Sequence, residues 1–204
     1  MIPFDDVPRE TQEQLALLYR LIKQESQRQN LVSASTLAES AFYERHIKDS
    51  AQLLRFAPTA RSWLDIGSGA GLPGLVLALL SDARIVLVEP RRRRAEFLIE
   101  ATEKLALTPR VRVVQTSVQT LPGSAGPFEA ITARAVASLS ALFEMAEHLA
   151  ASSTTWVLPK GRTASEELAS AQQAWQGVFR TELSRTALDS AIVIATDVRR
   201  RGAR

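Results

Sequence analysis

A glycine-rich segment that directly continues a short apolar run constrains this chain more than any other feature. The apolar run covers residues 62–66, and residues 65–74 read Asp-Ile-Gly-Ser-Gly-Ala-Gly-Leu-Pro-Gly. Glycines are needed where a backbone must turn tightly and approach a ligand closely. In doubly wound α/β sheets, ligands bind beside the loop that joins a strand to the following helix. The segment therefore predicts a ligand-binding loop at the carboxyl end of a buried strand.

The rest of the chain supports an α/β sheet, because short apolar runs alternate with helical patterns from residue 61 onward. The predicted strands are 62–66, 84–88, 111–115, 128–132, 155–158, 178–186 and 190–197, and the predicted helices are 73–80, 91–106, 138–150 and 164–176. Such alternation is typical of βαβ units on a parallel sheet. No helix separates the last two strands, so one of them is expected to run antiparallel at an edge.

Residues 1–60 have helical patterns and predict a helical N-terminal extension to a Rossmann-like, mostly parallel, doubly wound core over residues 61–204. An apolar stripe at helical spacing is formed by Leu15, Leu18, Tyr19 and Ile22. Thr36 and Glu39 have the spacing of a capping box and predict the start of a second helix. A third helix is expected to carry Ile47 and to end near Pro58. We expect a single domain over residues 1–204.

Composition excludes several kinds of site. The chain has no cysteine and only two histidines, which excludes disulfides, thiolate-bound metals, cysteine nucleophiles and a site with several histidine ligands. No apolar run approaches the roughly 20 residues of a membrane span, and the acidic residues 1–10 do not resemble a signal peptide. We therefore expect a cytoplasmic monomer that binds neither metal nor membrane.

Arginine accounts for 21 of the 25 basic residues, although the net charge is only +3. The planar guanidinium suits phosphate better than the lysine ammonium does. Residues 91–94 are four arginines that begin a predicted helix, where each positive charge costs ~0.3–1 kcal/mol against the helix dipole unless a phosphate offsets it. Further arginines stand at 199–201 and 204. We expect nucleic-acid contacts from Arg93, Arg94, Arg199 and Arg200, and the alternative is a solvated face.

The glycine loop fits two cofactor classes. Gly69, Gly71 and Gly74 satisfy the G-x-G-x-x-G pattern of dinucleotide-binding loops. Gly67, Gly69 and Gly71, preceded by Asp65, satisfy instead the pattern of methyltransferases that use S-adenosylmethionine. The spacing alone leaves both classes open.

Charge favours S-adenosylmethionine. A carboxylate at Asp65 would repel the pyrophosphate of a dinucleotide and attract the ammonium and sulfonium of S-adenosylmethionine. Glu89, twenty residues after Gly69, can hold the ribose hydroxyls of either ligand. Arg134 is predicted to end a strand at the same edge of the sheet, and a buried ion pair with either carboxylate is the alternative to a binding role. An NAD-dependent oxidoreductase is the less favoured reading of the loop.

Several short motifs occur in a fixed order along most of the chain. They are Asn30-Leu31, Arg45-His46-Ile47-Lys48-Asp49-Ser50, the loop at 67–74, Arg93-Arg94-Ala95-Glu96-Phe97-Leu98, Arg134-Ala135-Val136-Ala137-Ser138-Leu139 and Lys160-Gly161. Together they resemble the ribosomal RNA small subunit methyltransferase G family, also called glucose-inhibited division protein B. The chain departs from the family pattern at Glu25-Ser26, Val32 and Ser190-Ala191.

The resemblance implies a Rossmann-like, S-adenosylmethionine-dependent methyltransferase that methylates N7 of one guanine in the 530 loop of 16S rRNA. By position, it implies that Gly67 and Leu72 contact the donor, that Val118 and Gln119 flank its adenine, and that Arg134 completes the pocket. The implied partner is 16S rRNA, either free or in a small ribosomal subunit.

Arg45 and His46 are candidates for contacts with this RNA, because both lie in a basic stretch of a predicted helix. For His46, packing is the alternative to RNA binding. Asp49, one helical turn from Arg45, is expected to pair with that arginine. Lys160 is a further candidate, and it follows a strand whose carboxyl end is expected to share a face with those of Arg199 and Arg200.

The implied reaction needs no acid–base residue. Guanine N7 carries an in-plane lone pair and no proton, so the enzyme must desolvate the base and align N7 with the methyl group. We therefore expect no catalytic residue in the acid–base sense. A non-catalytic RNA- or ribosome-binding protein on a methyltransferase scaffold is the alternative from a different functional class.

Overall fold

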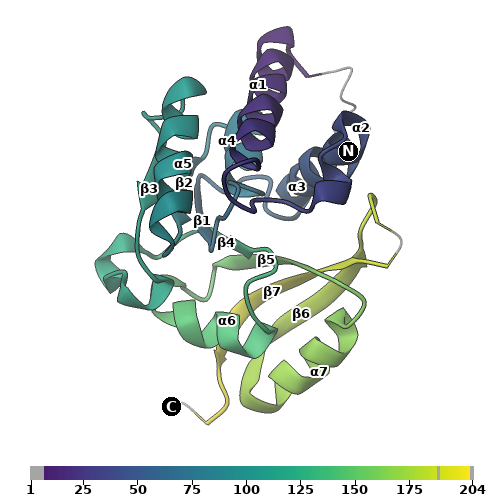
Figure 1. Cartoon of the computed structure of the whole chain (residues 1–204). Helices are drawn as coiled ribbons and strands as arrows, with labels where there is room; N and C mark the ends of the chain where they lie inside the picture. Colours follow the sequence, from purple (N-terminus) through teal and green to yellow (C-terminus); the bar gives the residue numbers. More distant parts are fainter. Residues whose placement is uncertain (1–6, 188, 203–204) are drawn as a thin grey trace.

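The computed structural model describes residues 7–187 and 189–202, and it shows a central sheet flanked by helices (Figure 1). The first six residues of the acidic N-terminal segment, and Arg204, lie outside the described residues. In the described chain, seven strands form one sheet in the order β3-β2-β1-β4-β5-β7-β6. They are β1 (Ser62–Ile66), β2 (Arg84–Val88), β3 (Val111–Val114), β4 (Ala130–Ala133), β5 (Thr155–Lys160), β6 (Trp175–Leu183) and β7 (Ala191–Arg200).

The strand directions confirm a mostly parallel, doubly wound sheet. The five strands from β3 to β5 are parallel, and β7 runs antiparallel between β5 and the outermost strand β6. The chain runs outward from β1 to β3 and then returns to β4 on the other side of β1. Ligands of such sheets bind at this switch point, beyond the carboxyl ends of the strands.

Helices cover both faces of the sheet. They are α1 (Arg9–Glu25), α2 (Glu39–Phe42), α3 (Asp49–Ala51), α4 (Gly74–Leu80), α5 (Arg92–Lys104), α6 (Leu139–Ala146) and α7 (Ala164–Ala174). The N-terminal helices α1 and α3 contact α4, whereas α6 and α7 contact each other. In Figure 1 the N-terminal helices stand beside α4 and α5, away from α6 and α7. The helical extension therefore packs on the α4 side of the sheet.

The core consists of two clusters of buried side chains, because the central parallel strands are apolar on both faces. Trp63 of β1 belongs to the cluster under α1, α4 and α5, and its neighbour Leu64 belongs to the cluster under α6 and α7. Phe143 lies at the centre of the second cluster, with its ring centroid 5.1 Å from that of Trp156 and 5.6 Å from that of Trp175. Alternate residues of one strand thus anchor opposite layers.

One expectation for the N-terminal extension is wrong, and another is confirmed in part. Thr36 does not cap a helix: α2 follows Ala38 without a side-chain cap, and the Thr36 hydroxyl donates to the Ser33 carbonyl oxygen at 2.9 Å. The helix that carries Ile47 does end before Pro58, but it continues directly from α2 through a π-helix over Tyr43–Lys48, α3 and a 3₁₀-helix over Gln52–Phe56, so the expected second and third helices are one helical stretch. The wider π-turn changes the direction of the side chains within this stretch, and π-turns of this kind are frequent at functional sites.

Two strand boundaries differ from the sequence expectation because tertiary pairing overrides the local pattern. The chain enters β4 only at Ala130, since the Phe128 N–H is occupied by the Leu149 carbonyl oxygen. Strand β6 begins at Trp175, earlier than expected, since this buried residue pairs with Arg200 of β7. The remaining predicted strands and the helices of the core are found within a few residues of their expected positions.

The aromatic cluster under α6 predicts a large loss of stability when its central ring is removed. Phe143→Ala is expected to lower the free energy of unfolding by about 3–5 kcal/mol, because the substitution removes buried apolar surface and leaves a cavity. Denaturant unfolding followed by tryptophan fluorescence measures the loss. The control Val178→Thr, at a side chain 67% exposed on β6, is expected to change it by about 0.5 kcal/mol or less. Equal losses in the two variants would contradict this assignment of the core.

Candidate functional site

The glycine loop between β1 and α4 requires glycine for conformation and for space. Gly67, Gly69 and Gly71 all have positive φ, at 65°, 57° and 81°. A Cβ atom at Gly67 would lie 2.7 Å from Val136 Cγ2, and one at Gly71 would lie 2.4 Å from Leu75 Cδ1. A Cβ at Gly69 would meet no heavy atom closer than 3.7 Å. The loop is thus packed on two sides and open at Gly69.

Asp65 is a buried carboxyl group with one unsatisfied oxygen. Its Oδ2 accepts a hydrogen bond from the Gly74 N–H at 3.1 Å, at the start of α4. Its Oδ1 is buried and has no hydrogen-bond partner among the described residues. Burial raises the pKa of Asp65 to about 7, against the opposing effects of the Gly74 N–H, the Ser68 hydroxyl and the Arg134 charge. A cation placed against Oδ1 would satisfy this carboxylate.

Glu89 ends β2 and holds the glycine loop against α5. Its Oε2 accepts from the Gly69 N–H and its Oε1 accepts from the Arg91 N–H, both at 2.9 Å. The side chain is only 2% exposed. The negative carboxylate therefore lies at the N-terminus of α5, where it favours the helix dipole and compensates part of the cost of the arginines there.

Two of the four arginines at residues 91–94 have side-chain partners within the protein. Arg92 pairs with Glu96 at 2.7 Å, and Arg94 Nη2 donates to the Asn30 carbonyl oxygen at 3.0 Å. The backbone oxygen of Arg93 accepts from Gln29 Nε2 at 3.0 Å. These contacts fasten the segment after α1 to α5, beside the glycine loop. The RNA contacts expected of Arg93 and Arg94 stay a prediction.

Three further residues expected at the cofactor lie around the same edge of the sheet. Val118 and Gln119 form a short 3₁₀-helix that follows β3, with Val118 buried and Gln119 exposed. Leu72 is buried in the cluster under α4. Their positions after β1 and β3, on either side of β2, are compatible with one elongated ligand along this edge, and their roles stay predictions.

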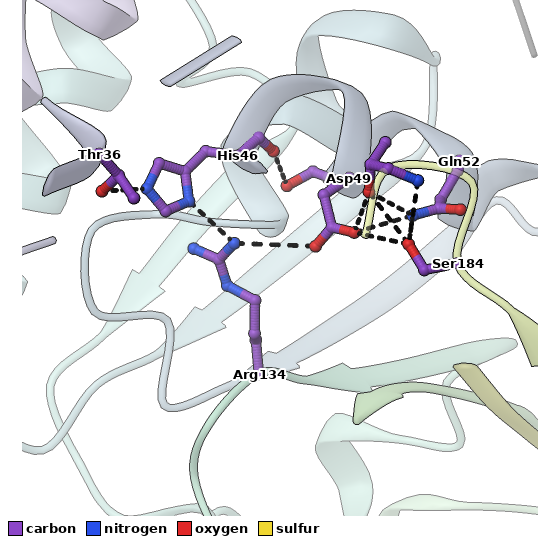
Figure 2. A network of polar contacts seen from close by, with 8 residues as sticks. Thr36, His46, Asp49, Gln52, Arg134 and Ser184 are labelled. Carbon is purple, nitrogen blue, oxygen red and sulfur yellow. Dashed lines mark hydrogen bonds and ion pairs between the residues drawn. The ribbon is translucent and has the colours of Figure 1, made fainter. Parts of the chain in front are cut away.

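Arg134 follows β4 and joins the sheet to the N-terminal extension (Figure 2). Its Nη1 lies 3.1 Å from His46 Nδ1 and 4.0 Å from Asp49 Oδ2. His46 belongs to the π-helix, and its Nε2 lies 2.9 Å from Thr36 Oγ1. The alternative of an ion pair between Arg134 and Asp65 or Glu89 is not found, because the guanidinium is directed at the extension instead.

These contacts determine the protonation of His46. Arginine only donates, so Nδ1 must accept, and Nε2 therefore carries the proton and donates to Thr36. Burial, together with the charges of Arg134 and Arg45, lowers the pKa of His46 to about 4. His46 is consequently neutral in the folded protein, and it positions Arg134 without adding charge.

Asp49 joins the extension to the hairpin between β6 and β7. Its Oδ1 accepts from Gln52 Nε2 at 2.8 Å, from Thr186 Oγ1 at 2.7 Å and from Ser184 Oγ at 3.3 Å. The expected pair with Arg45 is wrong, since Asp49 is directed toward Arg134 and the hairpin (Figure 2). Nothing in the sequence indicated the hairpin partners Ser184 and Thr186, which lie more than 130 residues away.

A cavity of about 480 Å³ opens beside Arg134. Its lining comes from the ends of β4 and β5, the start of β7, the hairpin and α7, and includes Asp49, Lys160, Glu167, Ser184 and Ser190. Lys160 Nζ donates to the Ala137 carbonyl oxygen at 2.6 Å and lies 2.9 Å from Glu167 Oε2. The cavity thus brings two cationic and two acidic side chains to the carboxyl edge of the sheet. Of these, Glu167 was not identified from the sequence.

The expectation that Arg199 and Arg200 share a face with Lys160 is wrong. Because β7 runs antiparallel to β5, Lys160 is opposite Ala191, and the two arginines lie at the far end of β7. Arg200 pairs with Glu144 at 2.8 Å, and its guanidinium lies 5.1 Å from the centroid of the Trp175 ring. The position of the two arginines could not be predicted, because an apolar run alone does not give the direction of a strand.

The described residues contain no group of three or more histidine, cysteine or acidic side chains that could hold a metal ion. None of the helices that the structure describes combines the length and the apolar character of a membrane span.

Comparison with known sequences identifies a family. The model of rRNA small subunit methyltransferase G matches residues 11–191. A protein of that name from Rhizorhabdus wittichii is 44% identical over 199 residues, which cover 96% of this chain and 90% of the relative. The protein of the same name from Zymomonas mobilis is 40% identical over 201 residues, covering 94% and 88%.

Solved structures share the fold. Cofactor-bound Rv0187 from MTB superposes with a TM-score of 0.62 at 18% identity, over 91% of this chain and 90% of that one. An O-methyltransferase from Bacillus cereus in complex with SAH gives a TM-score of 0.60 at 18% identity, over 88% and 90%. The architecture is therefore the Rossmann-like fold of class I methyltransferases.

The neutral state of His46 predicts a specific pH dependence of stability. Between pH 6.5, the ordinary pKa of histidine, and about pH 4, the unfolded chain binds a proton that folded His46 does not. His46 is therefore expected to lower the free energy of unfolding as the pH falls across this window, so that the wild type loses stability relative to His46→Gln. Asp65, whose pKa is raised to about 7, acts in the opposite direction in both proteins. Denaturant unfolding at a series of pH values measures the two slopes.

The matched control is His148→Gln, at an exposed side chain, which is expected to keep the wild-type slope. Identical slopes for wild type and His46→Gln would contradict the assigned state of His46.

Proposed function

The chain belongs to the rRNA small subunit methyltransferase G family, and we propose that it transfers the methyl group of S-adenosylmethionine to N7 of a guanine in 16S rRNA. The observation that carries the proposal is the unsatisfied Oδ1 of Asp65 beside an open glycine loop. A cavity of about 480 Å³ is lined by Arg134 and by Val136, the residue that packs against Gly67 of this loop. A donor site and a target-base site would thus meet at the switch point of the sheet.

The residues at the loop fit the donor. Asp65 would receive the ammonium group, since a cation compensates the buried carboxylate whose pKa is raised. Glu89 would accept from the ribose hydroxyls, because each carboxylate oxygen keeps a further acceptor site beside its bond to a backbone N–H. When bound, S-adenosylmethionine supplies an electrophilic methyl group on a sulfonium sulfur. Gly67, Leu72 and the pair Val118-Gln119 would line the rest of this site.

The cavity offers the hydrogen-bond partners that a guanine requires. Guanine presents acceptors at O6 and N7 and donors at its 2-amino group. Lys160 and Arg134 are donors, whereas Asp49 and Glu167 are acceptors, and all four line the cavity. An adenine places a donor at position 6, where the cations require an acceptor, so this arrangement favours guanine.

The chemistry requires alignment and desolvation. N7 has a lone pair and no proton, so no side chain has to act as a base, and a fixed orientation supplies most of the rate enhancement. Arg134 is held by His46 and Asp49 between the two sites and would contact both ligands. His46 would act as a positioning residue, because its contacts are with Arg134 and Thr36.

Transfer of a labelled methyl group tests the reaction. With methyl-tritiated S-adenosylmethionine, label is expected in one guanine of 16S rRNA, which then becomes sensitive to reduction and aniline cleavage. Naked 16S rRNA and small subunits should be compared as substrates. In Gly69→Val, donor binding and label should both be lost, since valine rarely adopts the positive φ of this position.

Other outcomes identify the alternatives. Label on a base carbon or a ribose oxygen would refute N7 transfer. Binding of rRNA with no label on either substrate would indicate a non-catalytic binding protein, and tight binding of NADH without S-adenosylmethionine binding would indicate an oxidoreductase.

Donor binding is also expected to release protons near neutral pH. The pKa of Asp65 is about 7 in the free protein, and a bound ammonium group favours the carboxylate and lowers that pKa. Near pH 6.5 the binding heat of S-adenosylhomocysteine, which carries the same ammonium group, should therefore depend on the ionisation enthalpy of the buffer. In Asp65→Asn this buffer dependence should disappear and affinity should fall. A wild-type heat that is independent of the buffer would rule out contact between Asp65 and the ammonium group.

A further inference from the structure

Two arginines from distant parts of the chain contact one phenylalanine ring, and a third, Arg185, lies near enough for its charge to act on Arg55. Arg55 and Phe56 end the 3₁₀-helix over Gln52–Phe56, Arg180 lies on β6, and Arg185 lies in the hairpin that follows it. The Arg55 guanidinium lies 4.4 Å from the centroid of the Phe56 ring, and that of Arg180 lies 5.7 Å from it. Cation–π contact of this kind holds a guanidinium flat against the ring and leaves its N–H edge for other partners.

This arginine cluster, Arg55, Arg180 and Arg185, is poorly compensated within the protein. None of the three forms an ion pair with a carboxylate among the described residues. Burial lowers the pKa of Arg55, the charges of Arg185 and Arg180 lower it further, and Glu182 opposes them. The Nε of Arg55 is buried without a hydrogen-bond partner. Like charges held together with an unused donor indicate a missing anion.

The cluster lies on the same structural unit as the cavity beside Arg134. The Arg185 N–H donates to Gln52 Oε1 at 3.0 Å, and Gln52 Nε2 in turn donates to Ser184 Oγ and to Asp49 Oδ1. Ser184 and Asp49 line the cavity, and Figure 2 shows Gln52 beside both of them. The arginines therefore stand next to the rim of the proposed target-base site.

We propose that Arg55, Arg180 and Arg185 bind the phosphates of a single-stranded rRNA segment that flanks the guanine in the cavity. This inference rests on the proposed function, because it assigns the cavity to the target base. Phosphate contacts fix the register of a nucleic acid on a protein, and the arginine fork matches a phosphate with two parallel hydrogen bonds. Phe56 positions the Arg55 guanidinium, and the hairpin brings Arg185 beside it.

RNA accounts for the position of the cluster better than an acidic protein does. A base that enters the cavity must bring its own backbone past the rim, so phosphates reach this surface in every productive complex. Three of the four arginines that the sequence pattern favoured have side-chain partners, since Arg94 is bonded to Asn30, Arg200 to Glu144, and Arg199 lies 3.7 Å from Asp197. The arginine cluster around Phe56 lacks such partners.

The salt dependence of RNA binding tests the proposal. For the double variant Arg180→Gln, Arg185→Gln, the slope of log affinity against log salt on a 16S rRNA fragment should fall by roughly one to two units, since each phosphate contact on a single strand contributes about 0.7. Binding of S-adenosylhomocysteine should not change. The melting temperature should stay the same or rise, because like-charge repulsion is relieved, whereas a merely structural role would lower it. The charge-conserving variant Arg180→Lys, Arg185→Lys should restore most of the slope.

The matched control is Arg84→Gln, Arg112→Gln, which removes the same charge from two exposed arginines on β2 and β3 and should change the slope much less. Equal slope changes in the two double variants would overturn the proposal, as would no change in either. Weaker binding to small subunits with unchanged binding to naked rRNA would overturn it in favour of a ribosomal protein partner. The expected slope difference between the wild type and the double variant, found together with no methyl transfer by the wild type, would refute the proposed reaction and leave the proposed RNA-binding surface supported.

Discussion

Arg134 brings a positive charge into the junction between the sheet and the N-terminal helices, and both of its side-chain partners come from the extension. His46 Nδ1 accepts at 3.1 Å, and Asp49 Oδ2 lies 4.0 Å away. Burial lowers the pKa of this arginine, and the carboxylates of Asp49 and Asp65 oppose the effect. Because a buried charge is costly without partners, the position of the guanidinium depends on the helices that supply them. Those helices in turn hold the hairpin that borders the cavity.

Two carboxylates at the same edge of the sheet have different surroundings and therefore different roles. Glu89 uses both oxygens to accept from backbone N–H groups and holds the loop in shape. Asp65 uses one oxygen in this way and leaves the other buried and unsatisfied. An unsatisfied buried polar atom costs free energy in the free protein, which a cationic ligand recovers on binding. The free loop is therefore less stable than it would be with a cation bound at this oxygen.

The arginines of the chain fall into two groups once their contacts are known. Arg92 and Arg94 at the start of α5 and Arg200 at the end of β7 are bonded to Glu96, Asn30 and Glu144 and contribute to the internal architecture. In the arginine cluster, the charges of Arg185 and Arg180 act on Arg55, and among the carboxylates Glu182 opposes them. A basic run in the sequence and a basic surface in the structure are therefore different things. Charge that is close along the chain is often neutralised locally, because helical neighbours at i+4 can supply a carboxylate.

Much of the fold could be predicted from the sequence because it depends on interactions between residues that are close along the chain. The glycines after β1 follow from backbone conformation, since positive φ at Gly67, Gly69 and Gly71 excludes most side chains. The alternation of apolar strands and amphipathic helices follows from burial on both faces of a parallel sheet, and the carboxyl at position 65 indicated the charge of the ligand. All of these depend on residues within one strand–loop–helix unit.

Long-range contacts decided the rest. Strand direction placed Arg199 and Arg200 at the opposite end from Lys160, and the π-helix directed Asp49 to Arg134 and the hairpin and away from Arg45. The cavity and the arginine cluster around Phe56 join segments that are more than 100 residues apart in the chain. A local pattern contains no information on such pairings, because they depend on which surfaces the folded sheet brings together. The sequence by itself thus determined the architecture and the glycine loop, and only the tertiary structure decided which charged side chains lie beside that loop.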